Sequence, residues 1–169
     1  MVDRDEFSAF VRANSRALQR SAWLLTGDWS AAEDLVQSAL VRTWARWQRL
    51  AAPEAALAYT RRVMFTVLLG WRGRRWIGEM ALGWLPEVVE RHDETELVDT
   101  RSDLLRAVGT LPPHQRAVVV LRYFDDLSEK DTAAALGCSV GTVKSQAARA
   151  LASLRAMSTL RVSESEELL

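Results

Sequence analysis

The sequence predicts an all-α protein made of two small helical domains joined by an acidic linker. Apolar residues recur with the 3.6-residue period of amphipathic helices, and no alternating strand pattern stands out. Between the two groups of helices, residues 77–99 combine Gly78, Gly83 and Pro86 with a series of acidic side chains. That composition is typical of a linker.

The first group predicts a helical bundle within a domain at residues 1–76. Gly27 is placed to end a first helix. Ser30 and Glu33 form a capping-box pattern at the start of a second helix. Pro53 suits the first turn of a third. The predicted helices are residues 5–25, a helix from Ser30, and residues 53–75.

The second group predicts a further helical domain at residues 100–158. Thr100 and Asp103 have the spacing of an N-terminal cap. Residues 159–169 form an acidic tail, which we expect to be disordered. The predicted helices of this domain are one from Thr100, one from Pro112, one from Ser128 to Gly137, and one over residues 139–157.

Residues 128–155 fit a helix-turn-helix. Ala133 is small where the two helices must touch, Gly137 can take the positive φ of a tight turn, and Val143 can fill the corner. The outer side of the second helix carries types of residue that contact nucleic acid. Glutamine can bridge adenine, arginine can fork onto guanine, and serine or threonine suits phosphate. We therefore expect this segment to bind DNA.

The net charge of zero hides an uneven distribution. Residues 1–78 carry +5 and residues 104–162 carry +4, whereas residues 79–103 carry −6 and the last seven residues carry −3. Basic blocks attract phosphates and give salt-dependent binding to nucleic acid. The balanced total fits a protein that does not bind DNA strongly by itself.

Several classes of protein fit poorly. A single cysteine, Cys138, with only His92 and His114, disfavours a zinc site and indicates a reducing compartment. Neither histidine has a nucleophile or second catalytic group nearby in sequence, so we expect no enzyme activity and no cofactor. No apolar run approaches the length of a membrane span, and the N-terminus is not a signal peptide. A cytoplasmic protein is expected.

Three blocks resemble the extracytoplasmic-function (ECF) sigma factors, most closely an actinobacterial subgroup. Residues 111–155 resemble region 4, which reads the promoter −35 element. Residues 32–47 resemble region 2.2, which docks on the β′ clamp helices of RNA polymerase. Residues 59–76 resemble regions 2.3 and 2.4, which melt and read the −10 element. The order and spacing match, and the resemblance leaves out only the linker and tail.

The resemblance implies core RNA polymerase (β′ clamp helices and β flap), promoter DNA and an anti-sigma factor as partners. Ser38 departs from an acid common in the family, and Thr66 stands where asparagine is usual. The resemblance assigns polymerase binding to Asp34, Gln37, Ser38 and Val41. It assigns the −10 element to Arg61, Arg62, Thr66, Trp71, Arg72, Arg74 and Arg75. It assigns the −35 element to Arg122, Ser139, Gly141, Thr142, Lys144, Ser145, Gln146 and Arg149.

Two alternatives remain open from the sequence. One is a stand-alone dimeric helix-turn-helix regulator, which predicts a palindromic DNA site. It leaves the block at 32–47 unexplained. The other is a sigma-like interaction module that does not open promoters. Thr66, Gly70 and Gly73, which depart from the family pattern, are the features that favour it.

Overall fold

The structure of the chain is a computed structural model that describes residues 4–50, 52–75 and 97–166, with side chains described at 4–50, 52–71 and 103–158. The elements are α1 (Arg4–Thr26), α2 (Trp29–Arg46), η1 (Trp47–Arg49), α3 (Pro53–Arg75), α4 (Leu97–Thr110), α5 (Pro113–Val119), η2 (Val120–Phe124), α6 (Glu129–Leu136) and α7 (Val140–Glu166). Every regular element in the described ranges is helical, which confirms the predicted all-α class. Most of the predicted linker, residues 77–96, lies outside the described residues.

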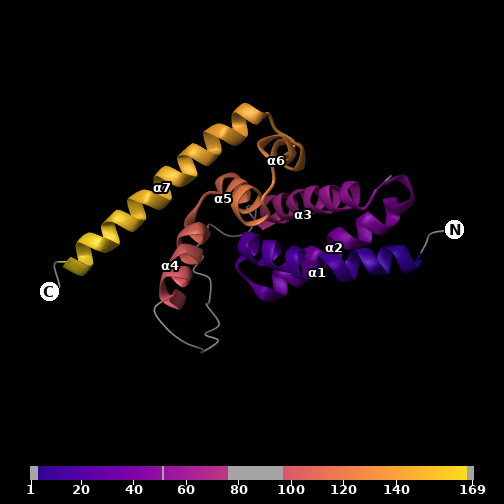
Figure 1. Cartoon of the computed structure of the whole chain (residues 1–169), viewed down its shortest axis with the longest axis horizontal. Coiled ribbons are helices and arrows are strands. Elements are labelled where there is room, and N and C mark those ends of the chain that lie inside the picture. The colour runs from indigo at the N-terminus through magenta and orange to yellow at the C-terminus, as the bar shows by residue number, and fades with distance from the viewer. Residues whose placement is uncertain (1–3, 51, 76–96, 167–169) are drawn as a thin grey trace.

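Helices α1, α2 and α3 form a bundle on one side of the molecule, as Figure 1 shows. The predicted apolar faces point inward, and Leu18, Leu35 and Met64 are almost fully buried in its core. Two polar side chains lie in the same interior. Thr43 on α2 and Thr60 on α3 meet through their hydroxyl oxygens at 2.9 Å, and each also donates toward the carbonyl one turn earlier in its own helix. Buried hydroxyls are tolerated there because they are hydrogen-bonded.

The corner between α1 and α2 corrects the predicted cap. Gly27 takes a φ of +71° and ends α1 as expected. The N-terminal cap of α2, however, is Asp28 and not Ser30, so the capping-box prediction was wrong. Asp28 has extended backbone angles, and its Oδ1 accepts a hydrogen bond from the Ala31 amide over 2.6 Å. A carboxylate caps as well as a hydroxyl and adds a favourable charge at the helix N-terminus.

The C-terminal half is built around α5, which continues into the π-helical turn η2. Proline at 112 precedes α5 as predicted. Val118 and Val143 pack with Ala133 in the helix-turn-helix, whereas Val108 and Val119 pack with Ala150 between α4, α5 and α7. Helix α7 therefore buries one side against this half and leaves the other side to solvent.

The two halves share a core. Ala117 and Val120, from the C-terminal half, belong to the same buried cluster as the interior of the bundle. Helix α3 packs against α6, and α1 packs against α4, α5 and η2. Figure 1 shows α5 and α6 lying between the bundle and α7. The helix-turn-helix is thus held directly against the helix to which the −10 element was assigned.

Two helix ends differ from the predictions. Helix α4 begins at Leu97, so Thr100 lies inside it rather than capping it, and residues 97–99 are helical. A capping pattern locates a helix start only to within about a turn. Helix α7 continues to Glu166, beyond the expected end at Met157 and into the tail predicted to be disordered. No glycine or proline follows Gly141 to stop it.

Candidate nucleic-acid interface

The helix-turn-helix forms as the sequence predicts. The Ser128 hydroxyl caps α6 by accepting from the Asp131 amide over 3.0 Å. Gly137 ends α6 with a φ of +66°, the left-handed conformation that a tight turn requires. Val143 is fully buried against Val118 and Ala133 in the corner. These contacts fix the angle at which α7 leaves the turn.

The outer face of α7 is open. Of the residues assigned to the −35 element, Thr142, Lys144 and Arg149 are exposed and Gln146 is half-buried at the edge of the face. Gly141, Ser139 and Ser145 are exposed beside them. Base-edge and phosphate contacts need such a solvent-facing series at the start of a recognition helix.

Some of these side chains already have partners. The Ser139 hydroxyl accepts from the Thr142 amide over 3.1 Å and so caps α7. Lys144 Nζ lies 3.7 Å from Glu129 Oε2 on α6, and the two side chains are 63% and 41% exposed. An exposed pair of this kind is weak and is readily exchanged for a phosphate.

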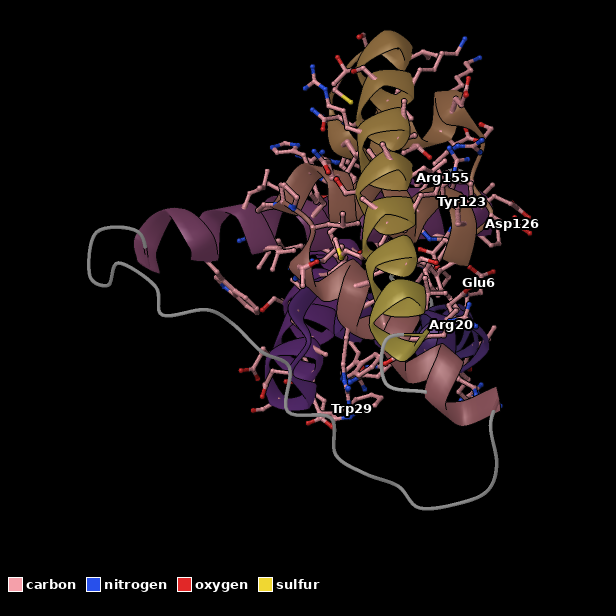
Figure 2. The ribbon with its side chains drawn as sticks, turned by 90° about the vertical axis from the view of Figure 1, so that its left-hand side faces the viewer. Glu6, Arg20, Trp29, Tyr123, Asp126 and Arg155 are labelled. Atoms are coloured by element: carbon pink, nitrogen blue, oxygen red, sulfur yellow. The ribbon has the colours of Figure 1, made fainter. Side chains whose placement is uncertain are left out.

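Arg122 is less available than the others. Its guanidinium donates to the carbonyl oxygen of Leu127 and lies over the Tyr123 ring, 5.8 Å from the centroid. The side chain is half-buried and braces the turn that leads into α6. Tyr123 and Asp126, on either side of the end of η2, are exposed (Figure 2). A phosphate contact by Arg122 stays a prediction.

The residues assigned to polymerase binding share one face of α2. Asp34, Gln37 and Val41 are exposed, and Ser38 is half-buried beside them. Their spacing places them on the side opposite the buried Leu35 and Ala39. Val41 keeps 67% of its surface in solvent, the largest value among the exposed large apolar residues that the structure describes. The exposed face of α2 therefore consists of one exposed valine surrounded by polar side chains.

The residues assigned to the −10 element are divided by the structure. Arg62 and Thr66 are exposed on α3, and the Thr66 hydroxyl donates to the Arg62 carbonyl over 2.9 Å. Trp71 is half-buried and packs against the bundle core. The side chains of Arg72, Arg74 and Arg75 lie outside the described ranges, although the backbone of α3 runs to Arg75.

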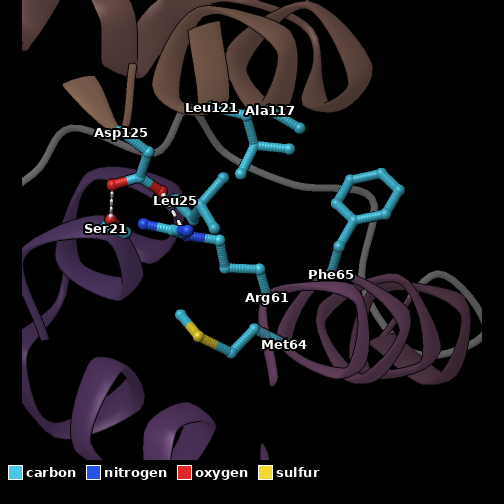
Figure 3. Close-up of a pocket in the computed structure, with 8 residues that line it drawn as sticks. All are labelled: Ser21, Leu25, Arg61, Met64, Phe65, Ala117, Leu121 and Asp125. Atoms are coloured by element: carbon cyan, nitrogen blue, oxygen red, sulfur yellow. Dashed lines mark hydrogen bonds and ion pairs between the residues drawn. The ribbon is translucent and has the colours of Figure 1, made fainter. Parts of the chain in front are cut away.

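Arg61 differs from its neighbours because it lies under the C-terminal half. Its Nε is 3.4 Å from Asp125 Oδ2, and the two side chains are 13% and 1% exposed. The Ser21 hydroxyl on α1 donates to the other oxygen of Asp125 over 2.6 Å. Figure 3 shows the Asp125 carboxylate between Ser21 and Arg61. Sequence reasoning missed Asp125 and Ser21, because nothing local marks a contact between residues 104 positions apart.

No helix among the described residues is long and apolar enough to cross a membrane. Over the same residues, no group of three or more His, Cys, Asp or Glu side chains lies close enough to hold a metal ion.

The fold and the exposed recognition helix define an all-helical DNA-binding protein, in which the bundle of α1, α2 and α3 packs beside the helix-turn-helix. The Sigma-70 region 2 family matches residues 10–77, and the Sigma-70 region 4 family matches residues 101–154. The RNA polymerase sigma-E factor of Streptomyces avermitilis is 45% identical over 150 residues, which cover 89% of this chain and 83% of that protein. The chain belongs to the sigma-70 family of RNA polymerase sigma factors, in its ECF group. Proteins of this class direct core RNA polymerase to promoters.

Other relatives agree with this assignment. The ECF RNA polymerase sigma factor SigM of Mycobacterium tuberculosis is 32% identical over 152 residues, which cover 90% of this chain and 76% of that protein. The same fold is found in the sigma factor RpoE of Bartonella quintana, solved in complex with the anti-sigma factor NepR. That chain superimposes with a TM-score of 0.72 at 24% identity, over 91% of this chain and 97% of its own length. The relatives are sigma factors, which are not enzymes.

Proposed function

We propose that this sigma factor docks on core RNA polymerase through α2, holds the −10 element with α3 and reads the −35 element with α7. The observation that supports it most is the solvent-facing recognition helix of the helix-turn-helix, together with the match of both halves to regions 2 and 4 in order. The protein works by binding alone, without a cofactor, and acts in the cytoplasm, where RNA polymerase is found.

The polymerase contact is proposed for the exposed face of α2. An isolated apolar side chain that is 67% exposed, as Val41 is, gains from burial in a partner. Asp34 and Gln37 flank it and can hydrogen-bond around its rim. By the resemblance, the partner surface is the β′ clamp helices, with the β flap contacting region 4. An anti-sigma factor is the expected inhibitory partner.

The −35 element is proposed to lie against the start of α7. Arg149 and Gln146 suit base edges, because arginine and glutamine can each make two hydrogen bonds to one base. Thr142, Lys144 and Ser145 suit the phosphate backbone and would set the register. Arg122 is a secondary phosphate contact, since part of its guanidinium is held by Leu127.

The −10 element is proposed to lie along α3. Arg61, Arg62, Arg72, Arg74 and Arg75 would hold backbone phosphates of the unpaired strand, and Trp71 would stack on a base. Thr66 lies on the exposed side of the same helix. A base leaves the duplex at a cost of a few kcal/mol, which stacking and polymerase contacts offset.

Engaging both elements at once requires the two halves to separate. The −10 and −35 elements lie about 25 base pairs apart, or about 85 Å of duplex at roughly 3.4 Å per base pair. In the structure, α6 of the helix-turn-helix packs directly on α3. This packing supports the proposal that the two halves move apart when the chain spans a promoter.

The polymerase contact is tested with Val41→Asp and with the double variant Asp34→Ala/Gln37→Ala. Co-elution with core RNA polymerase on size exclusion should be lost or much weakened, while the far-UV circular dichroism stays that of the parent. Arg16→Ala, on an exposed position of α1, is the matched surface control and should co-elute normally. Undiminished co-elution of both α2 variants contradicts the assignment of this face.

The same preparation separates the alternatives. Co-elution followed by promoter opening supports the proposal. Co-elution without opening favours an interaction module. A stable dimer that binds a palindromic duplex and ignores polymerase favours the stand-alone regulator.

A further inference from the structure

Asp125 is a buried carboxylate at the junction of the two halves. It follows η2, and its side chain is 1% exposed. One of its oxygens accepts from Ser21 on α1, and the other faces Arg61 on α3. Three segments that are distant in sequence are therefore joined at one side chain, as Figure 3 shows.

Further contacts surround this carboxylate on the same junction. Arg20 Nη2 donates to the carbonyl oxygen of Phe124 over 3.2 Å, and Arg116 Nη1 donates to that of Leu25 over 3.2 Å. The Phe65 ring meets the His114 ring edge-on, with centroids 5.5 Å apart. Apolar side chains line the rest of the small cavity here: Leu25, Met64, Phe65, Ala117 and Leu121.

The ion pair at the junction is incomplete. Arg61 Nε and Asp125 Oδ2 are both buried, and neither makes a hydrogen bond among the described residues. A buried ion pair without hydrogen bonds offsets less of its desolvation cost than a hydrogen-bonded pair does. Both charged groups regain their hydration when the two surfaces separate. The polar part of the junction is thus held by opposite charges and one hydroxyl, beside the apolar side chains that the two halves bury against each other.

The arrangement covers one functional surface and leaves two open. Arg61, assigned to the −10 element, is only 13% exposed beneath Asp125. The α2 face around Val41 and the α7 face around Arg149 remain in solvent. Docking on polymerase is therefore compatible with the closed arrangement, whereas use of Arg61 on a promoter strand is not.

We propose that Ser21, Asp125 and Arg61 form a polar clasp that keeps the free chain closed and withholds Arg61 from DNA until the C-terminal half moves away. The closing of the chain by the clasp depends only on the contacts of Ser21, Asp125 and Arg61. The effect on DNA binding also depends on the role of Arg61 in the proposed function.

The clasp is tested by energy transfer within the full chain. Cys138→Ala removes the native thiol, and dyes are placed on cysteines at Ala45 of α2 and Ala152 of α7, which are both exposed. The parent should show high transfer from a closed state. Asp125→Asn should lower the closed-to-open ratio about tenfold or more, because Arg61 then loses its counter-charge.

Asp126→Asn is the matched control. It removes the same charge one residue along, from an exposed side chain (Figure 2), and asparagine tolerates the φ of +57° at that position. Its transfer should equal that of the parent. The proposal is overturned if the parent is already open, if Asp125→Asn remains as closed as the parent, or if both asparagine variants open alike.

Circular dichroism separates opening from unfolding. If Asp125→Asn loses helix content, Ser21→Ala decides, because it removes the hydroxyl that contacts Asp125 Oδ1 and, within α1, the Ala17 carbonyl, and retains both charges. Partial opening by Ser21→Ala supports the clasp, and transfer equal to that of the parent overturns it.

A binding measurement on the same labelled chains tests the withholding of Arg61. A single-stranded oligonucleotide that carries the −10 sequence should bind Asp125→Asn more tightly, by about the factor by which the open state rises. If Asp125→Asn opens the chain but does not bind the oligonucleotide more tightly, Arg61 is not withheld from DNA and has no role at the −10 element. The clasp between the two halves is supported in that case.

Discussion

Arg116 donates from Nη1 to the carbonyl oxygen of Leu25 over 3.2 Å and thereby joins α5 to the end of α1. Its Nη2 also donates to the carbonyls of Gly109 and Leu111, and the residue as a whole is only 4% exposed. One planar guanidinium thus serves the ends of two helices. A single ammonium group could not reach all three oxygens with good geometry.

Arg116→Lys should therefore lower the free energy of unfolding by about 2 kcal/mol, since buried carbonyls lose their donors. Urea denaturation followed by circular dichroism measures it. Arg106→Lys is the control, because Arg106 is half-exposed and its pair with Asp103 is 3.9 Å long. A loss no larger than that of Arg106→Lys would show that the tether does not contribute to stability.

Because Thr43 and Thr60 share a hydrogen bond, we expect the effects of substituting them on the free energy of unfolding to be non-additive. Each hydroxyl has one hydrogen, so two hydrogens serve three contacts. Thr43→Val should cost about 1 kcal/mol, because it leaves Thr60 with one partner fewer. Thr43→Val/Thr60→Val should cost less than the sum of the single changes. Unfolding of the four proteins gives the coupling energy, and strict additivity contradicts the shared hydrogen bond.

Gly137 predicts a purely conformational penalty in the helix-turn-helix. A Cβ added there would meet nothing within 4 Å, so the strain comes only from the φ of +66°. Gly137→Ala should lower the free energy of unfolding by about 1 kcal/mol, and Gly137→Asn should lower it less, because asparagine tolerates that conformation better. Equal stability of the alanine variant and the parent would rule this out. Urea denaturation of the two variants provides the comparison.

Arg149 predicts a loss of promoter discrimination. If it forks onto a guanine, Arg149→Ala should weaken −35 duplex binding by about 1–3 kcal/mol and relax preference at one base pair. Both the loss of affinity and the change in base preference are measured by letting single-base variants of the promoter compete for the polymerase holoenzyme. Arg16→Ala on α1 is the control, because it removes the same charge at an exposed position away from α7 and from the polymerase face of α2. A uniform loss across sequences with a shallower salt dependence would instead place Arg149 on a phosphate.

Thr66 predicts a gain at the −10 element. Its hydroxyl hydrogen is already directed to the Arg62 carbonyl, so it has no donor left for a base. Thr66→Asn supplies an amide with two donors, and −10 oligonucleotide affinity should rise by about 1 kcal/mol. Thr66→Val should change affinity little. No gain from asparagine would mean that α3 does not present this position to a base.

Much of the fold could be predicted from local sequence patterns. Gly27 and Gly137 mark helix ends where positive φ is needed, and Ser128 caps α6, because these effects depend only on neighbouring residues. The helix-turn-helix and the open face of α2 follow from periodicity, since the apolar side of a helix must be buried and the polar side left to solvent. The choice of Asp28 over Ser30 did not follow, because two adequate caps lay only two residues apart.

The sequence by itself determined which segments are helices, which faces of α2 and α7 meet solvent, and the family to which the chain belongs. The tertiary structure alone decided that Arg61 lies beneath Asp125 and that α6 packs on α3. These contacts join residues more than fifty positions apart, and no periodicity or capping rule extends over that distance. They arise because the bundle and the C-terminal half each leave apolar surface that is buried only when the two meet.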